Sequence, residues 1–229
     1  MDHHYGMVAN GTLPGHDDEY YQGRRPKGFY IPPFVNINEE TRQTEFLGHY
    51  GFQGAASRTR NTPQGLIGAA LKDEIFKPGK WRVHMHGFGE MLPRHENRMY
   101  LDFNDRDKFG MPKIVFDVKW SENETKQRKH ALKSAVEMLE AAGCTNITTA
   151  DKIKEPGAAI HEMGTARMGR DPKTSVLNQW NQMHEVPNVF VTDGACMTSS
   201  SSQNPSITYM ALTARAVDYA DKQIKAGIL

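Results

Sequence analysis

An Asn-Pro pair followed by an apolar helical repeat constrains this chain more than any other feature. Asn204 is a strong N-cap residue, and Pro205 suits the first helical position. Apolar residues then recur at helical spacing along one face, at Ile207, Met210, Ala211, Ala214, Val217 and Ala220. A helix that begins at Asn204 directs its free N–H groups and positive dipole end toward the preceding loop. The sequence therefore predicts an anion-binding helix start in the last third of the chain.

The composition excludes several classes of function. The 28 basic and 27 acidic residues are spread along the 229-residue chain, so neither nucleic acid nor a membrane surface is an expected partner. Cys144 and Cys196 lie far apart without a C-x-x-C pattern, which predicts neither a disulfide framework nor a metal site. The sequence shows no signal peptide and no apolar run of membrane-spanning length, so the cytoplasm is the default expectation.

The first segment, residues 1–60, is expected to be rich in loops. Tyr20–Pro26 has the composition of a loop. Tyr30–Phe34 cannot be a central strand, because its two prolines cannot donate hydrogen bonds to a neighbouring strand. Phe46–Ser57, rich in aromatic residues and glycine, is either an edge strand or a loop that lines a ligand.

The middle segment, residues 61–160, is the β-rich part of the chain. Apolar and polar residues alternate over Trp81–His86, Arg98–Phe103 and Lys113–Trp120, which predicts three strands. Ser121 and Glu124 have the spacing of a capping box, and the helix that follows is expected to end at Gly143. Strands followed by a packing helix favour an α+β domain with a mostly antiparallel sheet.

His161 is the first candidate for catalysis. It opens the segment H-E-M-G-T-A-R-M-G, in which Gly164 and Gly169 allow the backbone to approach a ligand closely. A histidine can take a proton from an alcohol at neutral pH, and the amide of Asn204 can hold the same oxygen by hydrogen bonding. A lone histidine is more often structural, and from spacing alone the structural and catalytic roles of His161 remain equally open.

The last third of the chain, His161 to Tyr219, resembles the C-terminal signature of the glucose–methanol–choline (GMC) family of flavin oxidoreductases. The resemblance rests on H-x-x-G-T-x-R-M-G at His161, on the pair Asp193–Gly194 in V-F-V-T-D-G-A, and on Asn204 before Pro205. Met1–His4 is also similar to the family's N-L-M-D-H segment. The branch that it resembles most includes gluconate 2-dehydrogenase flavoproteins and pyranose or glycoside 3-oxidases.

The resemblance implies a function and a set of roles. It implies FAD as cofactor and a sugar or alcohol as substrate, with hydride passing to flavin N5 while His161 accepts the hydroxyl proton. Asn204 would be the second catalytic residue. The residues implied to contact FAD are Asp193, Gly194, Asn204, Pro205 and Ser206. The resemblance also implies that residues 1–60 join two domains, 61–160 bind substrate, and 161–229 form the catalytic and FAD-binding segment.

One departure from the family pattern changes the expectation for the whole chain. The family binds the ADP half of FAD through G-x-G-x-x-G, and Gly87-Phe88-Gly89 lacks the third glycine and the helix that should follow. The chain is therefore expected to be the C-terminal half of a longer enzyme, and to bind FAD poorly alone. The predicted strand Val189–Thr192 and the C-terminal helix would belong to an incomplete FAD-binding α/β domain and would expose apolar surface. A separate chain is one possible source of the missing domain.

Other interpretations remain open. The chain could be a non-catalytic fragment or interaction subunit that keeps the family's sheet domain without the cofactor. A metal-dependent hydrolase ranks last, because its ten histidines include no H-E-x-x-H motif. His84 and His86 share a strand face but are expected to be a surface pair rather than metal ligands. His3 and His4 either touch flavin or form a mobile terminus, and Cys196 is expected to be a small buried residue.

Overall fold

A computed structural model describes residues 3–16, 28–60 and 63–229. The elements of the central part are the strands and helices β1 (His3–Leu13), β2 (Gly28–Ile31), β3 (Tyr50–Arg60), α1 (Gly68–Phe76), β4 (Pro78–Glu90), α2 (Glu122–Ala141) and β7 (Thr145–Asp151). The others are β5 (Arg98–Arg106), β6 (Pro112–Asp117), the short 3-10 helix η1 (Gly194–Cys196) and α3 (Ser206–Lys225). The predicted α+β class with mostly antiparallel strands is confirmed.

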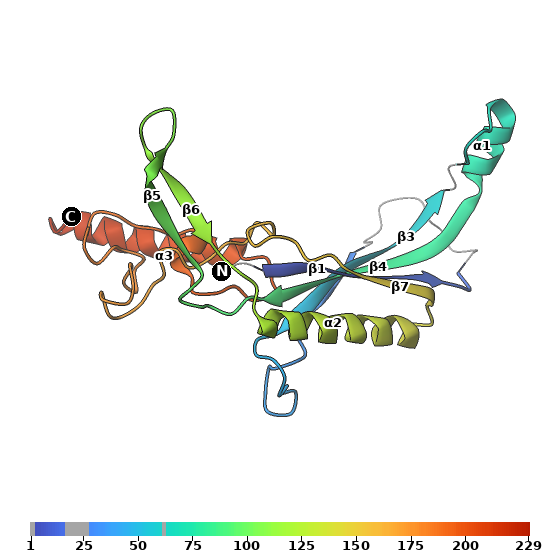
Figure 1. Cartoon of the computed structure of the whole chain (residues 1–229), viewed down its shortest axis with the longest axis horizontal. Coiled ribbons are helices and arrows are strands. Elements are labelled where there is room, and N and C mark those ends of the chain that lie inside the picture. Colours follow the sequence, from blue (N-terminus) through green and yellow to red (C-terminus); the bar gives the residue numbers. More distant parts are fainter. Residues whose placement is uncertain (1–2, 17–27, 61–62) are drawn as a thin grey trace.

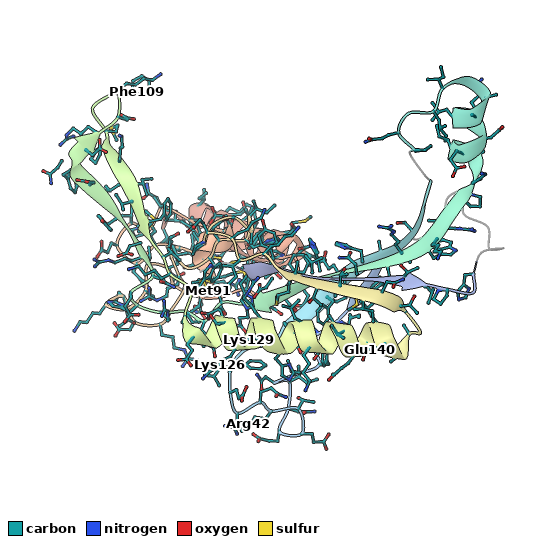
Figure 2. The ribbon with its side chains drawn as sticks, turned by 45° about the vertical axis from the view of Figure 1, so that its right-hand side comes forward. Arg42, Met91, Phe109, Lys126, Lys129 and Glu140 are labelled. Carbon is teal, nitrogen blue, oxygen red and sulfur yellow. The ribbon has the colours of Figure 1, made fainter. Side chains whose placement is uncertain are left out.

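A five-stranded antiparallel sheet forms the centre of the molecule, in the order β2-β3-β4-β1-β7. Figure 1 shows α2 along one face of this sheet, α3 and the preceding loops toward one end, and α1 at the other end. The hairpin of β5 and β6 forms a separate two-stranded sheet that projects from the body (Figure 1). Its tip carries Phe109, which points away from the rest of the molecule (Figure 2).

The hydrophobic core lies between α2 and the sheet. Buried residues of the sheet, of α2 and of the adjoining loops meet there: Met7, Ala9, Val35, Phe46, Tyr50, Phe52, Met85, Ala131, Ala135, Leu139 and Cys144. Tyr50 brings its hydroxyl into this layer, where it donates to Ser134 Oγ over 3.0 Å and lies 2.7 Å from His130 Nδ1. Burial raises the pKa of Tyr50 to about 12, so the hydroxyl keeps its proton.

The predicted capping box fixes the start of α2. The Glu124 carboxylate accepts from the Ser121 backbone N–H and hydroxyl, both over 2.6 Å, and the Ser121 hydroxyl accepts from the Asn123 N–H. The exposed Lys126, Lys129 and Glu140 lie on the same helix, with Lys126 close to its start and Glu140 near its end (Figure 2). Gly143, at φ +78°, follows the helix where the sequence predicts its end.

The other face of the sheet is not covered by α2. Because side chains alternate along a strand, His84, His86 and Phe88 of β4 lie opposite the core-facing Val83 and Met85. The loop before α3 contacts this sheet where β3 begins and β4 ends. Ser199 Oγ donates to Glu90 Oε1 over 3.1 Å, and Ser201 Oγ lies 3.3 Å from His49 Nε2.

The structure corrects the expectation of a loop-rich first segment. β1 is an inner strand of the sheet, paired with β4 on one side and β7 on the other, although it contains two glycines. Gly6 sits at its bulge with φ +95°, and Gly11 leaves room for the Cys144 side chain, so these glycines serve the strand rather than interrupt it. The expected loop Tyr20–Pro26 lies outside the described residues, as do Met1 and Asp2.

Three further predictions about strands have different outcomes. The Tyr30–Phe34 prediction is confirmed, because β2 is an edge strand and ends at Ile31, before the prolines. For Phe46–Ser57 both alternatives are wrong, since from Tyr50 onward it belongs to the inner strand β3. The strand Val189–Thr192 is also wrong: its residue Phe190 forms only an isolated bridge to Gln182, because no neighbouring strand pairs with it in the described chain.

Of the three strands predicted in the middle segment, two are confirmed over their whole length and the third is shorter than predicted. Trp81–His86 lies inside β4 and Arg98–Phe103 inside β5, whereas the strand predicted over Lys113–Trp120 ends at Asp117. The domain division at residues 60 and 160 stays a prediction, although strands from both sides of residue 60 share the main sheet.

Candidate active site

Two segments that the sequence singles out lie side by side. The backbone after His161 follows the 3-10 helix η1, with Gly164 N–H donating to Gly194 O over 3.3 Å and Ala166 N–H to Ala195 O over 2.9 Å. Met168 N–H continues the series to Cys196 O over 2.9 Å. The histidine segment and the Asp-Gly segment therefore form one unit, although no regular strand supports either of them.

The first turn of α3 completes this unit. Tyr209 donates its hydroxyl to Met163 Sδ over 3.4 Å. A Cβ added to the buried Gly194 would come within 2.5 Å of Glu162 O and 2.8 Å of the Tyr209 hydroxyl. Only glycine fits this position, because the chain's own backbone occupies the space that a side chain would need. Burial, and after it the nearby Asp193, raises the pKa of Tyr209, so this hydroxyl remains a donor.

His161 is half-buried at the edge of this unit. Its Nδ1 lies 2.6 Å from Ala159 O. A carbonyl oxygen can only accept, so Nδ1 carries the proton and a neutral ring has its lone pair on Nε2. The residue before it, Ile160, is a β-branched residue at φ +57°, in the left-handed region. Such backbone costs about 1–3 kcal/mol and occurs at functional sites.

The structure corrects the predicted start of the C-terminal helix. Pro205 rather than Asn204 holds the N-cap position, and no side chain caps the helix, which begins at Ser206. Asn204 is exposed, and it lines a hollow of about 550 Å³ together with residues of β2 and β3. The first N–H groups of α3 therefore have no side-chain acceptor.

The segments that carry the predicted site residues lie at or next to the first turn of α3. Met163, two residues after His161, contacts Tyr209 of that turn, and Asn204 precedes it in the chain. Asp193 is exposed, and its carboxylate accepts from Ala195 N–H over 2.9 Å, which starts η1. The sequence reasoning missed Tyr209, whose position lies off the apolar helical face that it followed.

The histidines of the sheet form no metal site. His84 and His86 have ring centroids 4.6 Å apart, and His84 Nδ1 lies 2.6 Å from Asn10 Oδ1 of the neighbouring strand. Burial, and after it the neighbouring His84, lowers the pKa of His86. Over residues 3–16, 28–60 and 63–229, no group of three or more His, Cys, Asp or Glu side chains is placed to hold a metal ion.

The N-terminal and cysteine expectations have clear outcomes. His4 is fully buried, and its Nε2 lies 2.5 Å from Gln127 Oε1 of α2, so it is neither mobile nor at the surface. Cys196 is fully buried beside the Asp-Gly turn, as predicted. None of the helices within the described residues is both long and apolar enough to cross a membrane.

The expected exposure of apolar surface on α3 is confirmed. Ile207, Met210 and Val217 keep 78%, 71% and 61% of their surface accessible, and Ala216 is the buried residue of this helix. A helix face of this kind is suited to packing against another protein surface.

Comparison with known proteins identifies the family and several relatives of this chain. The family model described as GMC oxidoreductase matches residues 93–213. The 2-methyl-1,2-propanediol dehydrogenase of Mycolicibacterium austroafricanum is 35% identical over 136 residues, covering 59% of this chain and 24% of that protein. The fructose dehydrogenase large subunit of Gluconobacter japonicus is 28% identical over 197 residues, which cover 81% of this chain and 35% of that protein. The gluconate 2-dehydrogenase flavoprotein of Pantoea cypripedii is 27% identical over 187 residues, which cover 72% of this chain and 30% of that protein.

The match identifies the C-terminal domain of a GMC oxidoreductase, and the relatives named above are dehydrogenases of a diol, a sugar and a sugar acid. The chain belongs to the GMC oxidoreductase family. The matched family model includes His161, Asp193, Gly194, Asn204, Pro205 and Ser206. The chain spans about a quarter to a third of the length of these curated relatives.

Proposed function

We propose that this chain forms the substrate-binding and catalytic portion of an FAD-dependent oxidoreductase that acts on CH–OH groups of sugars or alcohols. The observation that carries this proposal is the packing of the His161 segment, the pair Asp193–Gly194 and the first turn of α3 into one unit. The relatives include enzymes named as dehydrogenases of a diol and of fructose, which supports the same class of substrate.

In this proposal His161 is the general base. The Ala159 carbonyl holds the Nδ1 proton, so Nε2 is the atom that accepts the proton of the substrate hydroxyl. The fixed ring orientation also lowers the entropic cost of reaching the reactive geometry. Asn204 donates a hydrogen bond from its amide to the same substrate oxygen and so orients it.

The residues present fit a flavin. FAD, when bound, accepts at N5 the hydride that leaves the substrate carbon. Asp193, Gly194, Asn204, Pro205 and Ser206 are the residues that would hold it. The start of α3 has no side-chain cap, so its N–H groups and positive dipole end are available to an anionic group. Pro205 has no N–H, so the donors are those of Ser206 and Ile207.

A second protein surface would complete the flavin site. The exposed apolar face of α3 is the contact proposed for the domain that binds the rest of FAD. That domain would belong to the same protein beyond the present sequence or to a separate partner chain.

The test is the flavin absorbance of the purified chain, alone and co-expressed with a GMC-type G-x-G-x-x-G domain. We expect flavin to be retained only after co-expression. Flavin retained by the chain alone would contradict the need for a second surface. Absence of flavin in both preparations would contradict the proposed function and favour an interaction subunit without cofactor.

A further inference from the structure

One backbone conformation in the loop before His161 differs from every other in the described part of the chain. Four non-glycine residues there have a positive φ, and three of them are asparagines: Asn36, Asn146 and Asn181. Asparagine tolerates the left-handed region, because its short polar side chain can bond to the local backbone. Ile160, at φ +57°, is the fourth. For a β-branched residue this region is strongly disfavoured, so the surrounding structure must hold the residue there.

The Ile160 side chain does not explain why the residue adopts this conformation. It keeps 83% of its surface accessible, so packing in the core does not compensate for the strain. Residues in sparsely populated backbone regions persist only where their surroundings determine them, and they cluster at functional sites. The neighbours of Ile160, rather than its own side chain, therefore account for the conformation.

The left-handed residue lies between the two partners of a hydrogen bond. The His161 ring donates from Nδ1 to Ala159 O over 2.6 Å, and this contact closes across Ile160. A left-handed residue turns the chain sharply. Here the turn brings the His161 ring back to the carbonyl that lies two residues before it.

We infer that Ile160 is a positioning residue for His161, because its left-handed backbone keeps the ring against the Ala159 carbonyl, with the proton on Nδ1 and the lone pair on Nε2. The inference deepens the proposed function and rests on it, since the direction of this lone pair matters only if His161 accepts the substrate proton. A ring released from Ala159 would exchange its proton between the two nitrogens. Proton acceptance would then be slower, because the reactive geometry would no longer be held in advance.

The exposure of Ile160 allows substitutions that act on the backbone alone, since no cavity is left behind. Ile160→Asn introduces a residue that accepts the left-handed region, so the ring should stay in place. Ile160→Pro fixes φ at about −65° and so excludes this region. The matched control is Ile153→Pro, at an exposed isoleucine of the same segment whose φ is not positive. Neither isoleucine donates a hydrogen bond from its N–H within the described residues, so proline removes none.

The protonation pattern of the His161 ring can be measured on this chain without flavin. Proton–nitrogen NMR correlation spectra distinguish rings protonated on Nδ1 from rings protonated on Nε2, and the signals missing from His161→Ala assign the residue. Wild type, Ile160→Asn and Ile153→Pro should show the Nδ1–H form, whereas Ile160→Pro should show a mixture of both forms. An unchanged Nδ1–H form in Ile160→Pro would overturn the inference, and so would its loss in Ile160→Asn.

A stability measurement covers the case in which Ile160→Pro fails to fold. Because Ile160 is strained, Ile160→Asn should lower the equilibrium constant of unfolding about fivefold or more, which corresponds to the lower end of the cost of left-handed backbone. Ile153→Asn, at an exposed position without this strain, should give no such gain. Equal unfolding constants in the two asparagine variants would show that residue 160 is not held in this conformation, and would overturn the inference.

In the completed flavoenzyme the two proposals fail in different ways. Ile160→Pro should slow flavin reduction about 100-fold with little change in KM, and Ile160→Asn should stay near the wild-type rate. A wild-type rate in Ile160→Pro, with slow reduction in His161→Ala, would overturn the positioning role and leave the proposed function intact. A wild-type rate in His161→Ala would contradict the proposed function, whereas a protonation pattern that still follows residue 160 would support the placement of the ring.

Discussion

Ser199 and Glu90 are 109 positions apart in the sequence, and a 3.1 Å hydrogen bond from Ser199 Oγ to Glu90 Oε1 joins the loop before α3 to the end of β4. The same carboxylate lies 4.0 Å from His49, which in turn approaches Ser201. These contacts fix the loop on the sheet a few residues before Asn204. The position of the proposed substrate-holding amide therefore depends on a carboxylate at the end of β4.

Glu90→Ala should loosen this loop. With its acceptor removed, hydrogen exchange at residues 199–204 should become about five- to tenfold faster, since the net free energy of such a bond is about 1 kcal/mol. Hydrogen-exchange mass spectrometry measures this directly. Glu96→Ala removes an exposed carboxylate and serves as the control. Equal exchange in the two variants would show that Glu90 does not hold the loop.

Gly194→Ala should destabilise the protein. Its new Cβ would meet Glu162 O at 2.5 Å, and that oxygen belongs to the backbone and cannot rotate away. We expect a loss of about 1–3 kcal/mol in the free energy of unfolding, the range for overpacking. The midpoint of urea denaturation should be measured for Gly194→Ala and for the control Gly28→Ala, whose added Cβ would make only ordinary van der Waals contacts. A midpoint unchanged from wild type would mean that the Asp-Gly turn is not tightly packed.

The capping box should make stability depend on pH at the acid side. Burial alone would raise the pKa of Glu124, but hydrogen bonds from Ser121 and from the Leu92 N–H outweigh it and hold this pKa below its usual 4.5. A lowered pKa stabilises the folded state above pH 4.5, and this contribution is lost as pH falls through the folded-state value.

Glu124→Gln should therefore flatten the fall in unfolding free energy below pH 4.5, measured by denaturation at several pH values. Glu140→Gln, an exposed change near the end of the same helix, should keep the wild-type slope. A steep fall in Glu124→Gln identical to that of the wild type would assign the acid sensitivity to other groups.

The exposed face of α3 should matter for assembly and little for the stability of this chain. Ile207→Lys combined with Met210→Lys should change the unfolding free energy by less than about 0.5 kcal/mol per residue, because both side chains are exposed. The same variant should fail to co-purify with a co-expressed FAD-binding domain. Lys222→Ala, at the far end of the helix, is the control. Co-purification of the double variant at wild-type yield would place the contact elsewhere.

The sequence predicts best where one local rule decides the structure. The spacing of Ser121 and Glu124 predicts the start of α2, and the prolines after Ile31 exclude a central strand at that position. The glycines of β1 mislead, because their role depends on Lys152 and Cys144, far along the chain. Asn204 has the residue type of a cap, but the local pattern cannot show that Pro205 takes the N-cap position and leaves the helix start without a side-chain cap.

The candidate site likewise contains residues that a local pattern identifies and residues that only the three-dimensional contacts identify. Its motif residues at 161, 193 and 204 can be identified from the sequence, because each lies in a recognisable local pattern. Tyr209 and Glu90 could not be identified, because their contacts with Met163 and Ser199 exist only in three dimensions. Residues that support a site from a distant part of the chain carry no spacing signal of their own.

The most direct measurement of the central claim is anaerobic stopped-flow reduction of the flavin in the completed enzyme, with His161→Ala compared with the wild type. A lost general base should slow reduction by about 10²- to 10⁴-fold. His95→Ala, an exposed histidine on the sheet domain, should reduce at the wild-type rate. Reduction of the His161→Ala enzyme at nearly the wild-type rate would contradict the role of this histidine as the base.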